Sequence, residues 1–75
     1  MNETSKWQET DEDGNVTDTY YAFDTKAGGR VVISNGAAIF DDDPCVAYLH
    51  VQGSNLFTAD ECNELARLLM KVALA

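Results

Sequence analysis

The first stretch with residue types suited to chemistry is the acidic turn formed by residues 9–15. Counted from Glu9, two aspartates and Gly14 occupy the third, fifth and sixth positions of a calcium-binding EF-hand loop. The twelfth position holds Tyr20, where that loop needs a bidentate glutamate, and the flanking residues have no helical pattern. The turn therefore predicts an acidic hairpin and not a calcium site.

The thiols and the imidazole form the second candidate group. Zinc needs three or four Cys or His ligands, and the chain has only Cys45, His50 and Cys62. Strand alternation places Cys45 and His50 on opposite faces, which argues against a zinc site and against a Cys–His nucleophile. Cys62 lies near a predicted helix start, where a thiol pKa can fall, but the helical pattern places it on the buried arc. We expect both cysteines to be inert core thiols.

Consecutive carboxylates at Asp41, Asp42 and Asp43 form the third group. Paired carboxylates can bind a metal or act as acid and base. A short loop between strands is solvated, however, and nothing near it in the sequence supplies a pocket. We therefore expect no catalytic residue, no cofactor and no enzymatic activity.

Residues 57–75 have the amphipathic pattern of a helix, which is the strongest structural signal in the chain. Thr58, followed three residues later by Glu61, fits a capping box at a helix start. At ~100° per residue, the apolar side chains fall on one arc and the charged ones opposite. The arc contains Cys62, Leu65, Leu68, Leu69, Val72 and Ala73. We expect one helix over residues 58–74, with Met70 and Leu74 either frayed at its end or forming a small contact patch.

Five short segments before the helix have β-strand composition. They begin near Trp7 and continue with residues 16–23, 30–34, 37–40 and 45–52. Asn35-Gly36 favours a tight type I′ hairpin turn, and residues 41–44 are expected to be a loop because Pro44 has no N–H for a strand interior. The short links predict an antiparallel meander.

The chain as a whole is therefore predicted to be a single α+β domain over residues 1–75. It would comprise a loose arm in residues 1–6, a five-stranded antiparallel sheet in residues 7–52, and one C-terminal helix packed on one face.

The last predicted strand shows which face the helix would cover. Its inner side would hold Cys45, Ala47, Leu49 and Val51, and its outer side Val46, Tyr48, His50 and Gln52. A helix is too narrow to cover five strands. We expect Tyr48, Val46 and Tyr20 to remain partly bare on the outer face, which makes that face a candidate interface.

Charge is the outstanding feature of the composition. Thirteen acidic residues against five basic ones give a net charge of −8 over 75 residues. Direct contact with nucleic acid and with anionic membranes is disfavoured, because both need a basic surface. A basic protein partner or simple solubility remains. No apolar run reaches the ~20 residues of a membrane span and no export signal is recognisable, so a cytoplasmic location is expected.

Six of the thirteen acidic residues fall in two clusters that the meander would bring to the same end of the sheet. The first is Asp11, Glu12 and Asp13, and the second is Asp41, Asp42 and Asp43. Together they are expected to form one negative edge that binds a partner, with Tyr48 as an aromatic contact.

In its small size, extreme acidity and lack of catalytic groups, the chain resembles phage-encoded inhibitors of host defence, including anti-CRISPR proteins that act as DNA mimics. The resemblance is one of general character, so it assigns no residue a role. It implies a non-enzymatic protein that occupies the basic nucleic-acid site of a larger complex in the host cytoplasm. The alternative is a homo-oligomeric accessory or structural protein, in which the face around Tyr48 and Val46 or the Met70/Leu74 patch joins a second copy.

Overall fold

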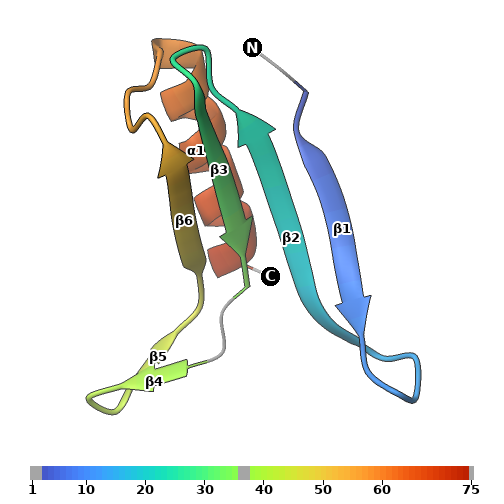
Figure 1. Ribbon diagram of the computed structural model, residues 1–75. Helices are drawn as coiled ribbons and strands as arrows, with labels where there is room; N and C mark the ends of the chain where they lie inside the picture. Colours follow the sequence, from blue (N-terminus) through green and yellow to red (C-terminus); the bar gives the residue numbers. More distant parts are fainter. Residues whose placement is uncertain (1–2, 36–37, 75) are drawn as a thin grey trace.

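The computed structural model describes residues 3–35 and 38–74. Six strands precede one helix (Figure 1). The strands are β1 (Ser5–Thr10), β2 (Val16–Asp24), β3 (Gly29–Ser34), β4 (Ala38–Phe40), β5 (Asp43–Cys45) and β6 (Tyr48–Gly53), and the helix is α1 (Ala59–Ala73). The predicted α+β class is confirmed.

The main sheet has four antiparallel strands in the order β1-β2-β3-β6. β3 pairs with β6, from Gly29 opposite Gly53 to Ser34 opposite Tyr48. The predicted fourth strand, β4, pairs instead with β5 in a separate two-stranded ribbon. The expected strand over residues 45–52 is divided into β5 and β6. The β4–β5 hairpin therefore interrupts the meander, and it pairs with neither β3 nor β6.

A tight two-residue turn closes the β4–β5 ribbon, whereas the sequence predicted such a turn at Asn35-Gly36. Its central residues, Asp41 and Asp42, have φ values of 50° and 67°. A type I′ turn requires positive φ at both central positions, and aspartate tolerates it better than most residues. The turn predicted at Asn35-Gly36 lies partly outside the described residues, and β3 does not pair with β4 in the part of the chain described.

Asp43 and Pro44 lie in β5, contrary to the prediction that residues 41–44 form a loop. Pro44 lies opposite Ile39 in β4. In a ribbon of two strands each strand has an unpaired edge, so a residue without an N–H is tolerated there, as it would not be inside a larger sheet.

The N-terminal arm is shorter than predicted. β1 begins at Ser5, and Lys6 already lies opposite Tyr21 of β2. The Thr4 hydroxyl donates a hydrogen bond to the Glu64 carboxylate of the helix. Residues 4–6 are therefore attached to the fold, because the pairing of β1 with β2 continues past the expected start at Trp7.

The helix begins with the predicted capping box. The Thr58 hydroxyl accepts a hydrogen bond from the Glu61 amide at 3.3 Å, and the Glu61 carboxylate accepts one from the Thr58 amide at 2.8 Å. Two of the amides left unpaired at a helix start are thereby satisfied.

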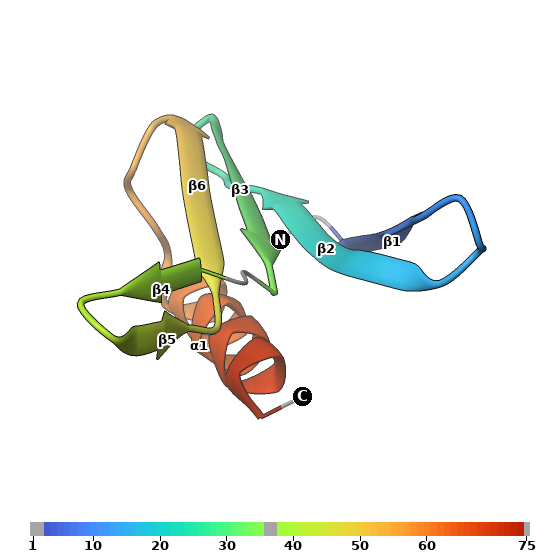
Figure 2. The same cartoon turned by 90° about the horizontal axis from the view of Figure 1, so that it is seen from below.

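The helix lies against one face of the sheet, as Figure 2 shows from below. The core lies between the helix and the side chains of β2 and β3 on that face. It consists of Tyr21, Phe23, Val31, Ile33, Leu68 and Val72. Ala47, Val51, Phe57, Leu65 and Leu69 pack against it partly buried. The sheet face turned away from the helix has no covering layer in the part of the chain described.

Four residues predicted for the core are exposed, and one of them is Ala73 in the last turn of the helix. Cys62 is exposed because the buried side of the helix consists of Glu61 with Leu68 and Val72 of the predicted arc, whereas Cys62 lies toward the opposite edge of that arc. Leu49 faces the helix side, opposite Ile33, but β6 is an edge strand and leaves it 45% exposed. Cys45 lies in the β4–β5 ribbon, away from the core.

Candidate functional site

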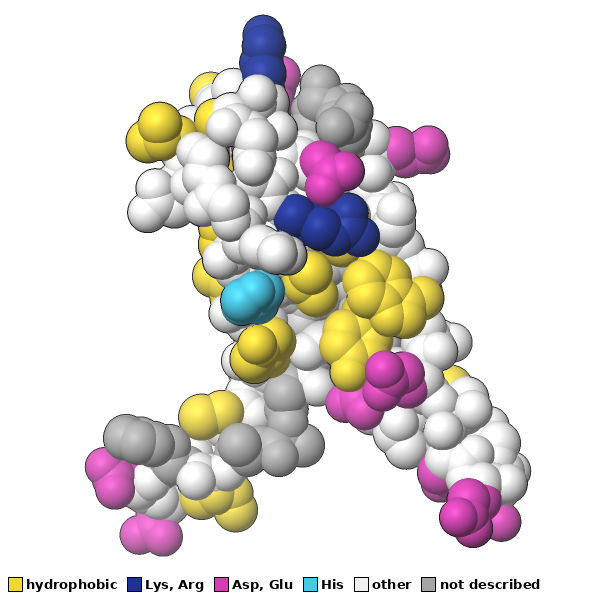
Figure 3. All heavy atoms as spheres, in the orientation of Figure 1, with side chains coloured by type: hydrophobic (Ala, Val, Ile, Leu, Met, Phe, Trp, Pro, Cys, Tyr) yellow, Lys and Arg dark blue, Asp and Glu magenta, His cyan; other side chains and the backbone are white. Residues whose placement is uncertain are grey.

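The two acidic clusters lie at the tips of two hairpins. Asp11, Glu12 and Asp13 occupy the turn between β1 and β2, and Asp41, Asp42 and Asp43 occupy the β4–β5 tip. Both tips lie at the same end of the molecule, as predicted (Figure 1). They form two separate acidic projections and not one continuous edge (Figure 3), because β4 and β5 leave the sheet.

Within the first cluster, Asp11 has an internal role. Its Oδ1 accepts hydrogen bonds from the amides of Asp13 and Asn15, each at 2.9 Å, and Gly14 takes a φ of 82° to close the turn. This is the local side-chain bonding that aspartate favours in turns. All three side chains of this tip are exposed, and Glu12 and Asp13 are the two whose carboxylates are not engaged by the hydrogen bonds of the turn.

The turn does not assemble a metal site. Among residues 3–35 and 38–74, no group of three or more His, Cys, Asp or Glu side chains is arranged to hold an ion. Cys45 and Cys62 are exposed free thiols on different elements, and His50 is exposed on β6.

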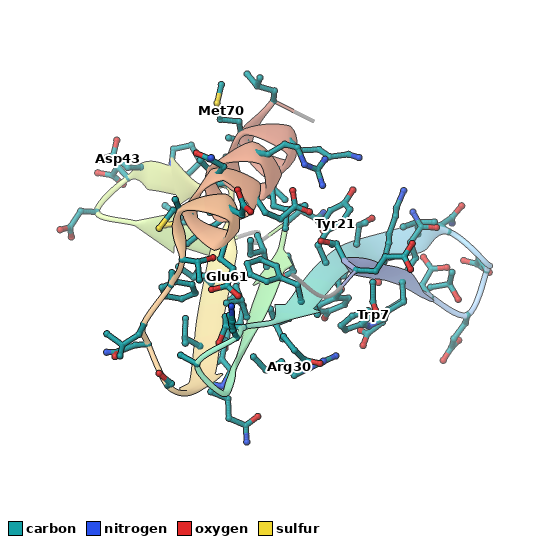
Figure 4. The ribbon with its side chains drawn as sticks, turned by 90° about the horizontal axis from the view of Figure 1, so that it is seen from above. Trp7, Tyr21, Arg30, Asp43, Glu61 and Met70 are labelled. Carbon is teal, nitrogen blue, oxygen red and sulfur yellow. The ribbon has the colours of Figure 1, made fainter. Side chains whose placement is uncertain are left out.

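The helix-free face of the sheet carries a stacked aromatic pair. Trp7 of β1 lies opposite Tyr20 of β2, with ring centroids 5.3 Å apart and planes 7° from parallel. Trp7 is 40% exposed, and Figure 4 shows it pointing away from the helix. Trp7 was expected only as the start of the first strand, and this aromatic surface is the main feature that the sequence did not predict.

Tyr48 extends this pair into a row across the whole sheet. Strand register places Trp7 opposite Tyr20, Tyr20 opposite Ser34, and Ser34 opposite Tyr48. Tyr48 is 54% exposed, on the face where it was predicted. Val46, which was expected beside it, lies in the link between β5 and β6 and not on the sheet. We call the row of these four residues the aromatic row.

Carboxylates border the aromatic row on the side of the acidic hairpin tip. Glu9 and Asp18 lie opposite each other, two residues beyond Trp7 and Tyr20 on the same face. The Tyr20 hydroxyl lies 3.4 Å from Glu9 Oε2. Partial burial raises the pKa of Tyr20, and the negative charges of Glu9 and Asp18 raise it further. The row therefore meets a negative potential at this end (Figure 3).

Near the other end of the same face, an ion pair lies across β2 and β3. Arg30 Nη1 lies 3.0 Å from Asp24 Oδ1, and both side chains are about half exposed. The pair leaves little net charge there. The acidic character of the face is thus concentrated on the β1–β2 hairpin.

Comparison of the chain with protein-family models, with curated proteins and with solved structures finds no match. In the part of the chain that the structure describes, no helix has both the length and the apolar character needed to cross a membrane.

Proposed function

We propose that this chain is a non-enzymatic inhibitor that binds a basic, nucleic-acid-binding protein. The observation that carries the proposal is the exposed aromatic row on the helix-free face, bordered by Glu9 and Asp18 and continued into the acidic tip of the β1–β2 hairpin. This surface combines a flat π face with nearby negative charge.

Such a surface suits arginine and lysine side chains. A guanidinium can stack on the exposed face of Trp7 while its N–H groups bond to a carboxylate such as Asp18. Basic grooves that bind nucleic acid present many such side chains. The two acidic projections, one on each side of the molecule, would add electrostatic attraction to the same partner.

The resemblance to DNA-mimic inhibitors supports the same class of partner. In this proposal, Glu12, Asp13, Asp41, Asp42 and Asp43 take the place of phosphates, and the aromatic row supplies the contact area. Two projecting clusters suit a groove or a pair of basic patches better than a single flat edge. The proposed location is the cytoplasm, where host nucleic-acid-binding complexes act.

The experiment is a pull-down of basic proteins from bacterial lysate on immobilised chain, with elution by salt and by duplex DNA. We expect captured proteins to bind nucleic acid and to be released by either. A double variant, Trp7→Ala with Asp18→Asn, should lose the capture, while Met70→Ala on the outer side of the helix should keep it. Equal capture by the double variant, or release by salt but not by DNA, would contradict the proposal.

The exposed aromatic row also favours a second candidate, a homo-oligomer joined through this face. Three aromatic side chains on one uncovered sheet face form the kind of patch that associates. Sedimentation at increasing concentration separates the two candidates. A dimer that is abolished by Trp7→Ala would favour self-association. A chain that stays monomeric at all concentrations would favour the candidate that binds a basic partner.

A further inference from the structure

A small hollow lies on the opposite side of the sheet, between the β1–β2 hairpin and the C-terminal half of the helix. Its volume is ≈ 170 Å³, and its lining includes Lys6, Gln8, Thr19, Tyr21, Asn35 and Lys71. Most of the sheet residues come from β1 and β2, whereas Lys71 comes from the last turn of α1. The hollow is therefore built from both ends of the chain.

Two lysines converge at this hollow in a strongly acidic protein. The amino groups of Lys6 and Lys71 lie 5.8 Å and 5.3 Å from the centroid of the same Tyr21 ring. In the described part of the chain, neither lies within 4.0 Å of a carboxylate, whereas Arg30 and Arg67 are both paired. Two positive charges thus lie near the same buried ring and line the same hollow.

The neutral groups of the hollow present mainly hydrogen-bond donors. Asn35 Oδ1 accepts from the Thr19 amide at 2.7 Å, which leaves the Asn35 side-chain NH₂ for another partner. The Thr19 hydroxyl oxygen accepts from Gln8 Nε2 at 3.3 Å, which leaves the hydroxyl hydrogen and the second Gln8 N–H. Gln8 also carries an amide oxygen that can accept, and Tyr21 a hydroxyl that can donate or accept.

Hydrogen bonds from Arg67 and Thr4 lower the pKa of Glu64, and the positive charge of Lys71, two turns further along the helix, contributes to the lowered value. The Glu64 carboxylate is already engaged, because Arg67 binds both of its oxygens and the Thr4 hydroxyl donates to it as well. The positive charge at the hollow is therefore not neutralised by a direct contact with Glu64.

We propose that this hollow binds a phosphate group. Two ammonium groups suit the −1.5 to −2 charge that a phosphate monoester carries near neutral pH, and the remaining N–H and O–H groups can bond its oxygens. The hollow is smaller than the ≈ 300–1,000 Å³ typical of cofactor pockets, so it fits the phosphate group itself and not a nucleotide. This proposal concerns the other face of the sheet and does not depend on the proposed inhibitor function.

The test is a titration followed by two-dimensional amide NMR. Inorganic phosphate and phosphoserine are added in parallel, with sodium chloride at matched ionic strength as the control. We expect saturable shifts of the Thr19 and Asn35 backbone amides and of the Gln8 and Asn35 side-chain amides. Tighter binding of phosphoserine would assign the hollow to a monoester, and tighter binding of inorganic phosphate would assign it to the free ion.

Matched lysine variants decide whether the hollow is responsible. Lys6→Gln with Lys71→Gln should weaken phosphate binding about tenfold or more, while Lys26→Gln, which removes a lysine outside the hollow, should leave it unchanged. The same spectra report whether each variant is folded. Equal shifts with chloride, or equal weakening by the Lys26 variant, would overturn the proposal.

Discussion

Glu61 Oε2 accepts a hydrogen bond from the backbone amide of Lys26 at 2.7 Å, and this bond joins the start of the helix to the turn between β2 and β3. The other oxygen of the same carboxylate accepts from the Thr58 amide at 2.8 Å. Hydrogen bonds from these two amides lower the pKa of Glu61, because they favour its charged form. Glu61 is almost completely buried, so a single carboxylate both caps the helix and fixes its position on the sheet.

Replacing Glu61 with alanine should lower the midpoint of thermal unfolding by at least several degrees. The substitution leaves the Thr58 and Lys26 amides without their acceptor. Glu61→Gln keeps one acceptor oxygen, so its unfolding midpoint should lie between those of the alanine variant and the parent. Asp60→Ala, at an exposed position of the same helical turn, is the control. Equal midpoints for the Asp60 and Glu61 alanine variants would show that the buried contact is not stabilising.

The pH dependence of stability should be governed in part by Glu64. Hydrogen bonds from Arg67 and Thr4 lower the pKa of Glu64 to about 2, from an ordinary value of 4.5. A carboxyl whose pKa is lowered in the folded state stabilises that state above the unfolded pKa and ceases to do so as pH falls through the folded pKa. We therefore expect a loss on the order of 2 kcal/mol between about pH 4.5 and about pH 2.

Urea unfolding at a series of pH values measures this loss. Glu64→Gln should show a flatter curve over the same range, because it has no carboxyl to protonate. The Glu61 contribution has the same sign and remains in the variant, so the difference between parent and variant isolates Glu64. Parallel curves for the two proteins would count against the assignment.

Leu68→Ala should be the most damaging single truncation on the helix. Leu68 is fully buried in the core cluster, and removing a buried leucine side chain typically costs about 2–5 kcal/mol. Leu65 and Leu69 are only partly buried, so replacing either with alanine should destabilise the fold less. Met70→Ala should change stability by no more than about 0.5 kcal/mol, because Met70 is 63% exposed. Chemical denaturation of the variants tests this order.

Gly29→Ala should destabilise the fold more than Gly14→Ala, although of these two glycines it is Gly14 that has a positive φ. A Cβ at Gly29 would lie 2.1 Å from the backbone oxygen of Ser54 and 2.9 Å from the Thr25 hydroxyl, and the backbone cannot move away cheaply. We expect a cost of about 1–3 kcal/mol or more. At Gly14 nothing lies within 4 Å, so the cost is the conformational strain of about 1–2 kcal/mol. A reversed order of melting midpoints would show that the contact with Ser54 is not formed.

Replacing Asp41, Asp42 and Asp43 with asparagine should leave the fold intact and weaken binding to a basic partner. Asparagine tolerates the positive φ of the two central turn positions, so the ribbon should persist. If both acidic projections engage the partner, we expect affinity to fall about tenfold, or about 1.4 kcal/mol, at low salt, and less as salt rises. Circular dichroism checks the fold, and salt-dependent binding checks the charge effect.

The sequence predicts the helix well because its signals are local. The capping box, the helix start at Thr58 and the strand over residues 16–23 each depend on residues a few positions apart. The pairing of β3 with β6 depends on contacts between residues about 20 positions apart, for which the chain has no local signal. The displaced arc of the helix has a similar cause, because the polar Glu61 occupies the buried side by bonding backbone amides of the sheet turn.

The candidate site was predicted in part. Tyr48 lies on the expected face, and both acidic clusters lie at one end of the molecule. The exposure of Trp7 was not predicted, because a single tryptophan at the start of a strand has the residue type of a core residue as much as of a surface one. The spacing did contain a usable signal: a tight turn over residues 10–15 places Trp7 and Tyr20 on the same face of one hairpin.

The β4–β5 ribbon makes the region between β3 and β6 an interchangeable module. Since β3 and β6 are adjacent and antiparallel, a tight turn between Ser34 and Tyr48 would join them without changing the register of the sheet. The ribbon can therefore be changed in length and charge without a change in the four-stranded scaffold. Grafting foreign loops between Asn35 and Ala47 would use this freedom.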